Sequence, residues 1–342
     1  MKFDIARQPL VPAFLTLAAI AVAAMCRVDA RTALNALFES TDASASLAPD
    51  AVEGLRIPPL ATLLFRFQNA SPVWAHLIGG YLLLFAGMCT GRLSVRYNLY
   101  TVGTCLSIPL YAVAACGIAA DSHYLAAYTA SALMALSVKN FCRSFRNGYG
   151  FDGIFRAALY LSLLVLVMPA AAPLLLALPL AVLLFRRTIR ESVVSLAGLV
   201  LPAATLCYLN WGSGGTFFAP MEALVQLFTE GTPLQLFRHT PLPGLFLLGG
   251  IALLTVVALL FFLTDLYAAG SKPRFLLLFN IGVLLLSAAA LCGPAATPAL
   301  YALAAVPAAL LLPLFFVRIR PSIALALYLV LLAATGLNIF VQ

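Results

Sequence analysis

Residues 244–264 read GLFLLGGIALLTVVALLFFLT, an uninterrupted apolar run without a charged side chain. A helix of about 20 apolar residues crosses the roughly 30 Å hydrocarbon core of a bilayer. The run is too long and too unalternating for a strand of a transmembrane barrel, and backbone exposed to lipid must satisfy its own hydrogen bonds. It therefore predicts a membrane-spanning α-helix.

Comparable apolar runs recur along the chain, separated by short polar or basic breaks. We expect eleven crossings, at about residues 10–26, 72–90, 99–119, 122–138, 157–169, 173–185, 192–210, 244–264, 275–292, 299–317 and 321–340. The predicted fold class is all-α, a polytopic transmembrane helical bundle of about 11 helices. We expect one integral membrane domain over residues 1–342.

The composition supports this class and excludes others. Hydrophobic residues make up 63% of the 342 residues and charged residues 9%, whereas a soluble protein needs about a quarter of its residues charged. A soluble globular enzyme, a disordered chain and a fibre are therefore excluded. The net charge of +8 lies in the breaks between apolar runs, so we expect membrane lipids and no nucleic acid as partners. The seven cysteines show neither a disulfide framework nor zinc spacing.

Residues 157–185 are long for one helix and short for two. Arginines flank this stretch on both sides, and a hairpin turning near residues 169–173 would bring both basic flanks to the cytoplasmic face; one long helix remains the alternative. With the hairpin, fifteen of the twenty Lys and Arg residues face inside. The sequence then predicts a multi-pass protein of the inner (plasma) membrane, with a cytoplasmic N-terminus and an outer C-terminus.

Two outer segments, residues 27–71 and 211–243, are long enough to hold structure of their own. Apolar side chains within 31–38, 58–67 and 221–228 suggest helices lying in the headgroup plane, which could roof a cavity among the spans. Most acidic residues and all three histidines fall on this outer face. They mark a candidate site there, although acids also accumulate in long loops without any function.

Familiar catalytic motifs are absent from the sequence: there is no GxxxxGKS loop, HExxH, GxSxG or paired CxxC. The glycine pairs Gly79–Gly80 and Gly249–Gly250 predict close helix packing. Asp29 follows the first span between Arg27 and Arg31, as a local ion pair or as a carboxylate that coordinates a metal or phosphate. The arginines of the cytoplasmic breaks fit anionic headgroups, or a bound phosphate.

One block has a wider resemblance. Residues 149–214 read YGFDGIFRAALYLSLLVLVMPAAAPLLLALPLAVLLFRRTIRESVVSLAGLVLPAATLCYLNWGSG, with a glycine-containing start, an apolar stretch broken by proline, an arginine-rich turn, a glutamate and a Gly-Leu-x-x-Pro helix. This block resembles a family of uncharacterised bacterial inner-membrane proteins of about 300 residues. That resemblance implies no activity.

The same block is distantly similar to the membrane core of the glycosyltransferase C superfamily. Those enzymes carry a long first outer loop with two interfacial helices and use polyprenyl-phosphate-linked sugars on the outer face. Their loop holds a near-adjacent carboxylate pair, where this chain has the separate Asp29 and Glu39. The resemblance implies that one of these would bind a divalent cation or act as general base, and that Arg66, His123 or His239 would neutralise the lipid phosphate.

The sequence thus leaves open whether the protein is an enzyme. Our leading hypothesis is a non-catalytic scaffold or accessory subunit in envelope or lipid-linked-glycan processes, with another membrane protein as its partner. The alternative is the glycosyltransferase-like enzyme, with a polyprenyl-phosphate lipid as its partner. A transporter is the third hypothesis, and the scarcity of charges within the spans argues against it.

Overall fold

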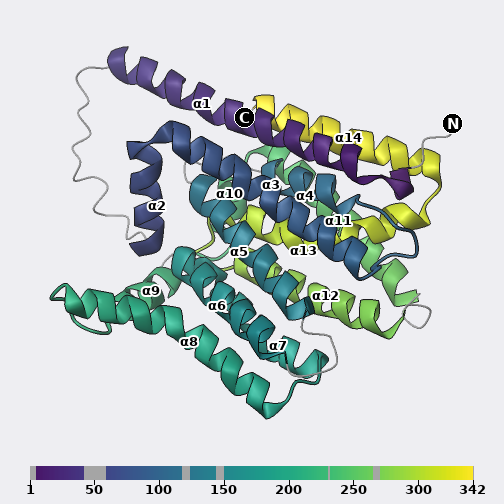
Figure 1. The fold of residues 1–342 in the computed structure, drawn as a ribbon. Coiled ribbons are helices and arrows are strands. Elements are labelled where there is room, and N and C mark those ends of the chain that lie inside the picture. The colour runs from purple at the N-terminus through teal and green to yellow at the C-terminus, as the bar shows by residue number, and fades with distance from the viewer. Residues whose placement is uncertain are drawn as a thin grey trace.

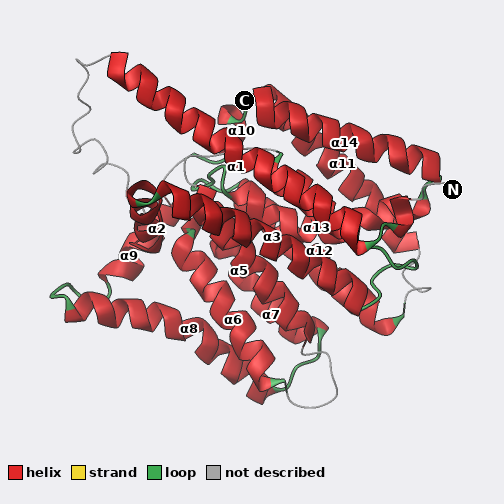
Figure 2. Cartoon of the chain, turned by 45° about the horizontal axis from the view of Figure 1, so that its top comes forward, coloured by secondary structure: helices red, strands yellow, loops and turns green. Residues whose placement is uncertain are grey.

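The computed structural model describes residues 5–41, 59–117, 124–143, 150–229, 232–264 and 270–341. Within these ranges every regular element is a helix, as predicted (Figure 2). The elements are η1 (Ile5–Arg7), α1 (Leu10–Thr41), α2 (Pro59–Ala70), α3 (Pro72–Arg96), α4 (Ser107–Cys116), α5 (Tyr124–Arg143), α6 (Phe151–Val167), η3 (Pro169–Leu176), α7 (Ala177–Leu184), α8 (Ile189–Gly212), α9 (Ala219–Thr229), α10 (Gln235–His239), α11 (Leu242–Thr264), α12 (Ser271–Leu291), α13 (Leu300–Arg318) and α14 (Pro321–Val341).

Seven of the described helices are long and apolar enough to cross a membrane: α1, α3, α8, α11, α12, α13 and α14. Large apolar side chains are exposed on six of these helices, all except α13, among them Trp74 on α3 and Phe246 on α11. A surface of this kind is typical of a chain whose surrounding solvent is lipid. The all-α class is confirmed and the seven long apolar helices are consistent with a multi-pass membrane protein, while the number of eleven crossings stays a prediction.

Helices α3 and α5 lie side by side and run in the same direction. Near their starts the His76 ring stacks on the Tyr124 ring, with 5.1 Å between centroids. Near their ends Lys139 Nζ lies 4.0 Å from Cys89 Sγ. We call the end of the bundle with His76 and Tyr124 the far end, and the opposite end, where Arg143 closes α5, the basic end.

Helix α6 and the η3–α7 segment form a hairpin. Helix α6 stops at Met168, whose backbone is extended, and Pro169 begins η3. The backbone N–H of Gly150, just before α6, donates at 3.0 Å to the carboxylate of Glu191, which follows α7 in the chain. Both ends of residues 151–184 therefore lie together at the basic end, which agrees with the predicted hairpin and not with one long helix.

Helix α1 extends beyond the predicted first span. It continues from Leu10 to Thr41, so residues 31–38 are helical as predicted but form the distal part of α1 instead of a helix of their own. The sequence explains the extension, because no glycine or proline occurs between Ala13 and Thr41 to end the helix. The helices predicted over 58–67 and 221–228 correspond to α2 and α9, and their interfacial position stays a prediction.

Helix α4 is shorter than the span predicted over 99–119, and all of its ten residues are buried. The preceding non-helical stretch is hydrogen-bonded to its neighbours: Cys105 N donates to Gln8 O at 3.0 Å, and Tyr100 Oη donates to Leu310 O at 2.9 Å. Irregular backbone at membrane depth is tolerated where protein surrounds it in this way. Hydroxyl pairs fix α4 between α3 and α5, with 3.1 Å from Ser107 Oγ to Ser94 Oγ and 2.6 Å from Tyr111 Oη to Ser131 Oγ.

Helix α13 lies in the middle of the bundle and α8 at its edge (Figure 1). Two prolines, Pro307 and Pro313, interrupt the backbone hydrogen bonding of α13. Neighbouring side chains donate to its carbonyls: Asn280 Nδ2 of α12 to Pro307 O at 2.9 Å, and Tyr100 Oη to Leu310 O. The centre of the fold is therefore held by hydrogen bonds as well as by apolar packing.

The two glycine pairs differ in their surroundings. A Cβ built on Gly79 would lie 3.2 Å from the Tyr124 ring, so α3 and α5 approach closely there as predicted. At Gly249 and Gly250 of α11 nothing in the described chain lies within 4 Å of such a Cβ. The predicted close packing at Gly249–Gly250 is therefore wrong as far as the described residues are concerned.

Candidate functional site

The two carboxylates proposed for catalysis, Asp29 and Glu39, lie on the single helix α1. Ten residues separate them, and at 1.5 Å per residue their Cα atoms are about 15 Å apart along the axis. Their side chains lie outside the part of the chain that the structure describes. The structure does not bring these two positions together, so they cannot form the near-adjacent pair that the glycosyltransferase resemblance implies.

The three residues proposed to bind a lipid phosphate are dispersed over the chain. Arg66 is exposed on α2. His239 is the last residue of α10, and its side chain is outside the described part. His123 lies outside the described residues. The divalent cation stays a prediction as well: among the described residues, no group of three His, Cys, Asp or Glu could hold a metal ion.

A polar cluster that the sequence did not reveal joins five helices at the far end. Arg27 Nη1 of α1 donates to Asn338 O of α14 at 3.4 Å, and Tyr128 of α5 lies in the same region. The Tyr128 hydroxyl lies 3.8 Å from Cys116 Sγ of α4, and His76 of α3 stacks on Tyr124 within the same region of α5. A basic residue facing a bundle interior is a functional-site candidate by default. The hydrogen bond that Arg27 donates to Asn338 O connects α1 with α14.

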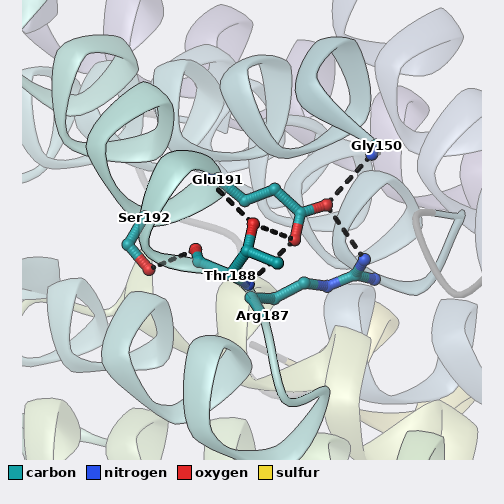
Figure 3. Close-up of polar contacts among 5 residues, drawn as sticks. All are labelled: Gly150, Arg187, Thr188, Glu191 and Ser192. Atoms are coloured by element: carbon teal, nitrogen blue, oxygen red, sulfur yellow. Dashed lines mark hydrogen bonds and ion pairs between the residues drawn. The ribbon is translucent and has the colours of Figure 1, made fainter. Parts of the chain in front are cut away.

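A second polar cluster surrounds Glu191 at the basic end (Figure 3). The residue is only 3% exposed. Its Oε1 accepts from Gly150 N at 3.0 Å and from Arg187 Nη1 at 3.4 Å. Its Oε2 accepts from Thr188 N at 3.1 Å and from Thr188 Oγ1 at 3.2 Å. Four donors from two segments, Gly150 before α6 and Arg187–Thr188 before α8, therefore satisfy one buried carboxylate, as a buried charge requires.

The Glu191 cluster fixes the start of α8 to the start of α6. Thr188 Oγ1 accepts from Glu191 N at 3.4 Å, which completes a reciprocal capping box. Burial lowers the pKa of Arg187, and the neighbouring carboxylate opposes that shift; the guanidinium stays charged at neutral pH. The pattern Thr-x-x-Glu at residues 188–191 was visible in the sequence. It predicts the cap, but not the bond to Gly150 from 41 residues away.

The contact of α8 with α6 is close along the rest of its length. A Cβ on Gly198 would lie 2.6 Å from the Phe155 carbonyl oxygen and 3.4 Å from the Ala158 side chain. Only glycine allows the two backbones to approach this closely. The buried side of α8 is therefore small and polar, and the helix is attached through that side.

The chain has seven helices long and apolar enough to cross a membrane, and large apolar side chains on its surface. Together with the hydrogen-bonded polar groups of its interior, these features are typical of a multi-pass helical integral membrane protein. Within this class the comparisons point to no particular protein. Neither the models of known families, nor the curated proteins, nor the solved structures contain a match to this chain. The two resemblances drawn from residues 149–214 stay predictions.

Proposed function

We propose that this protein is a non-catalytic scaffold or accessory subunit of the inner (plasma) membrane, crossing the bilayer eleven times. The observation that carries the scaffold role is how the interior polar side chains are used. Tyr111 pairs with Ser131 at 2.6 Å, and Thr240 pairs with Tyr301 at 2.9 Å. These groups hydrogen-bond across helices instead of converging on one space, as expected of a rigid frame that holds a lipid or another membrane protein.

Four further segments support the count of eleven. In addition to the seven long apolar helices, α4, α5, α6 and the η3–α7 segment run between the same two ends of the bundle. Ser137 Oγ near the end of α5 donates to Ala157 O near the start of α6 at 2.9 Å, as antiparallel neighbours do. Helix α4 runs back from Ser107 beside Ser94 to Cys116 beside Tyr128. Counting these four gives an odd number of crossings and termini on opposite sides.

The distribution of basic residues supports a cytoplasmic N-terminus. Among the described side chains, only Arg27, Arg66 and Arg238 belong to the far end. Those of the basic end are Arg7, Arg92, Arg96, Lys139, Arg143, Arg156, Arg186, Arg187, Arg190, Lys272, Arg274, Arg318 and Arg320. Short cytoplasmic loops are enriched in Lys and Arg, so the basic end is assigned to the cytoplasm.

Cysteine labelling tests the topology. Cys292 is exposed at the far end, and a variant that keeps only this cysteine should react with a membrane-impermeant maleimide in intact cells. A cysteine-free variant carrying Arg190→Cys should react only after lysis, and a variant keeping only the buried Cys142 should react in neither case. Labelling of Arg190→Cys in intact cells, with Cys292 protected, would overturn the orientation.

A double substitution separates the scaffold from the glycosyltransferase-like alternative. In the native host, Asp29→Ala with Glu39→Ala should leave both the protein level and the phenotype unchanged, because a scaffold does not need these carboxylates. Gly198→Leu, which disrupts packing, should instead reproduce the deletion phenotype with a reduced protein level. If the carboxylate variant matches the deletion strain at normal abundance, the enzyme is favoured and the scaffold proposal fails.

A further inference from the structure

The turn between α7 and α8 has an unusual residue at its corner. Arg187 N donates to Val182 O at 3.0 Å and Arg186 N donates to Leu183 O at 3.3 Å, the pattern that closes a helix C-terminus. Arg186 has a φ of 48°, a left-handed conformation that glycine normally supplies at this position. A side chain with a Cβ is disfavoured there. The chain nevertheless has an arginine at this corner.

The side chains of the two consecutive arginines in this turn, Arg186 and Arg187, lie in different surroundings. The Arg187 side chain is 9% exposed and pairs with Glu191, whereas Arg186 is exposed, as is Arg190 in the first turn of α8. The Glu191 carboxylate is already occupied by its four donors. Within the described residues no ion pair involves Arg186 or Arg190, and both of their side chains are exposed at the basic end.

Helix termini add to this charge. Helices α6 and α8 both begin at this end, as the bond from Gly150 N to Glu191 shows. Each helix start carries partial positive charge from its aligned backbone N–H groups, which Glu191 at the start of α8 and Asp152 in the first turn of α6 partly offset. The two exposed arginines therefore supply most of the positive charge that is complementary to an anion.

The outward face of α8 adds an apolar track to this surface. Ile189, Val193, Leu196 and Val200 are each more than half exposed, and their spacing of four, three and four residues places them on one face of the helix. The opposite face of α8 packs on α6 through Gly198. A positive site at the end of an exposed apolar stripe matches a molecule with a negative head and hydrocarbon tails.

We propose that the α7–α8 turn and the outer face of α8 bind an anionic phospholipid. The lipid phosphate lies at Arg186 and Arg190, and the acyl chains follow the stripe from Val193 to Val200. The proposal rests on the membrane embedding proposed above, since the stripe must face lipid. It assigns a reason to Arg186: the guanidinium is kept at a left-handed position because it contacts the headgroup.

Quenching by brominated lipids tests the proposal on the full-length chain. Both native tryptophans, Trp74 and Trp211, are replaced by Phe, and Leu196→Trp places a single reporter on the stripe. The protein is reconstituted in phosphatidylcholine bilayers with increasing brominated phosphatidylglycerol. Each arginine near an anionic lipid contributes about five-fold in affinity, so two arginines should make brominated phosphatidylglycerol preferred over brominated phosphatidylcholine by roughly 25-fold.

Matched variants locate the preference. Arg186→Gln with Arg190→Gln should bring the ratio close to one. Arg318→Gln with Arg320→Gln removes two exposed arginines from the same end and should leave the ratio unchanged. Equal quenching by both lipids in the parent protein, or an equal loss in the two double variants, would overturn the site.

Two further measurements separate a lipid site from a purely structural role of Arg186 and from a site for free anions. Arg186→Gly relieves the left-handed strain, so it should retain or raise thermal stability while the lipid preference falls by about five-fold; an unchanged preference would remove Arg186 from the site. Inorganic phosphate should not displace the quencher, and displacement would indicate a free-anion site and overturn the lipid. If cysteine labelling gives the expected topology and quenching shows no preference, only the lipid site is wrong.

Discussion

Helices α13 and α8 are similarly apolar, but α13 lies inside the bundle and α8 at its edge. The mean hydropathy of their apolar stretches is 2.3 for α13 and 1.9 for α8, yet 83% of the residues of that stretch are buried in α13 and 17% in α8. Helix α13 is surrounded by protein, whereas α8 packs on the bundle along one face (Figure 1). In a membrane protein, apolar content does not distinguish the interior from the surface, because lipid is as apolar as leucine.

The type of residue that each helix buries distinguishes α8 from α13 better than hydropathy does. The buried residues of α8 are Glu191, Ser195, Gly198 and Cys207, a narrow strip of small or hydrogen-bonded side chains. Helix α13 buries apolar residues on all sides and receives hydrogen bonds at two carbonyls from Tyr100 and Asn280. Burial in this fold therefore follows close approach and hydrogen bonding between helices.

The largest expected difference comes from the same substitution in both helices. Leu311 of α13 is fully buried and Leu196 of α8 is 56% exposed. Leu311→Ala leaves a cavity and should lower the free energy of unfolding by about 2–5 kcal/mol, whereas Leu196→Ala, facing lipid, should change it by less than about 0.5 kcal/mol. Titration with SDS in mixed micelles measures both. Similar losses for the two variants would mean that α8 is also packed against protein.

The next comparison uses two arginine–carboxylate pairs, each four residues apart. Glu191→Ala leaves the shielded Arg187 charge without its carboxylate and should cost about 3 kcal/mol. Asp152→Ala breaks the 2.7 Å pair with Arg156, whose side chains are 70% and 56% exposed, and should cost less than about 1 kcal/mol. The same SDS titration compares them. Equal effects would show that the Glu191 cluster does not anchor α8.

Two glycines give a smaller contrast. Gly198→Leu forces α8 away from the Phe155 carbonyl and should destabilise the protein by about 1–3 kcal/mol. Gly250→Leu on α11, where a side chain meets open space, should be neutral or slightly stabilising because leucine has the higher helix propensity. Thermal unfolding followed with a thiol-reactive dye, which reports exposure of buried cysteines such as Cys142, checks the order. A milder effect at Gly198 than at Gly250 would contradict the close α6–α8 contact.

Much of the fold was predictable because local signals decide it. Apolar runs of span length gave the helical class, and the basic flanks of residues 157–185 favoured the hairpin that Gly150 and Glu191 now support. The extension of α1 beyond the apolar run of residues 10–26 was not anticipated, because an apolar run ends where hydropathy falls, while a helix continues where no glycine or proline interrupts it. The reduced helical length of α4 was not predictable, since its preceding stretch is stabilised by partners at Gln8 and Leu310.

The candidate site was less predictable than the fold. Asp29 and Glu39 were chosen because they are acidic residues near a span, but both lie on α1, about 15 Å apart along its axis. Arg27 and His76 reach helices that are distant in sequence, and only the packing of α1, α3 and α5 brings those contacts together. The capping box at Thr188 was a local pattern. The bond from Gly150 N to Glu191 is a long-range contact, for which one sequence carries no signal.

The smallest expected effect concerns the hydrogen bonds that support α13. Tyr100→Phe removes the donor to Leu310 O at 2.9 Å but keeps the ring, so the carbonyl loses one partner without a change in packing. Interhelical hydrogen bonds in membrane proteins contribute about 0.6 kcal/mol on average, and we expect a loss of about that size in the SDS titration. Tyr208→Phe on α8, where the side chain is 62% exposed, is the matched control and should have no measurable effect. If Tyr100→Phe is equally silent, the carbonyls near Pro313 do not need outside donors, and α13 is central through apolar packing alone.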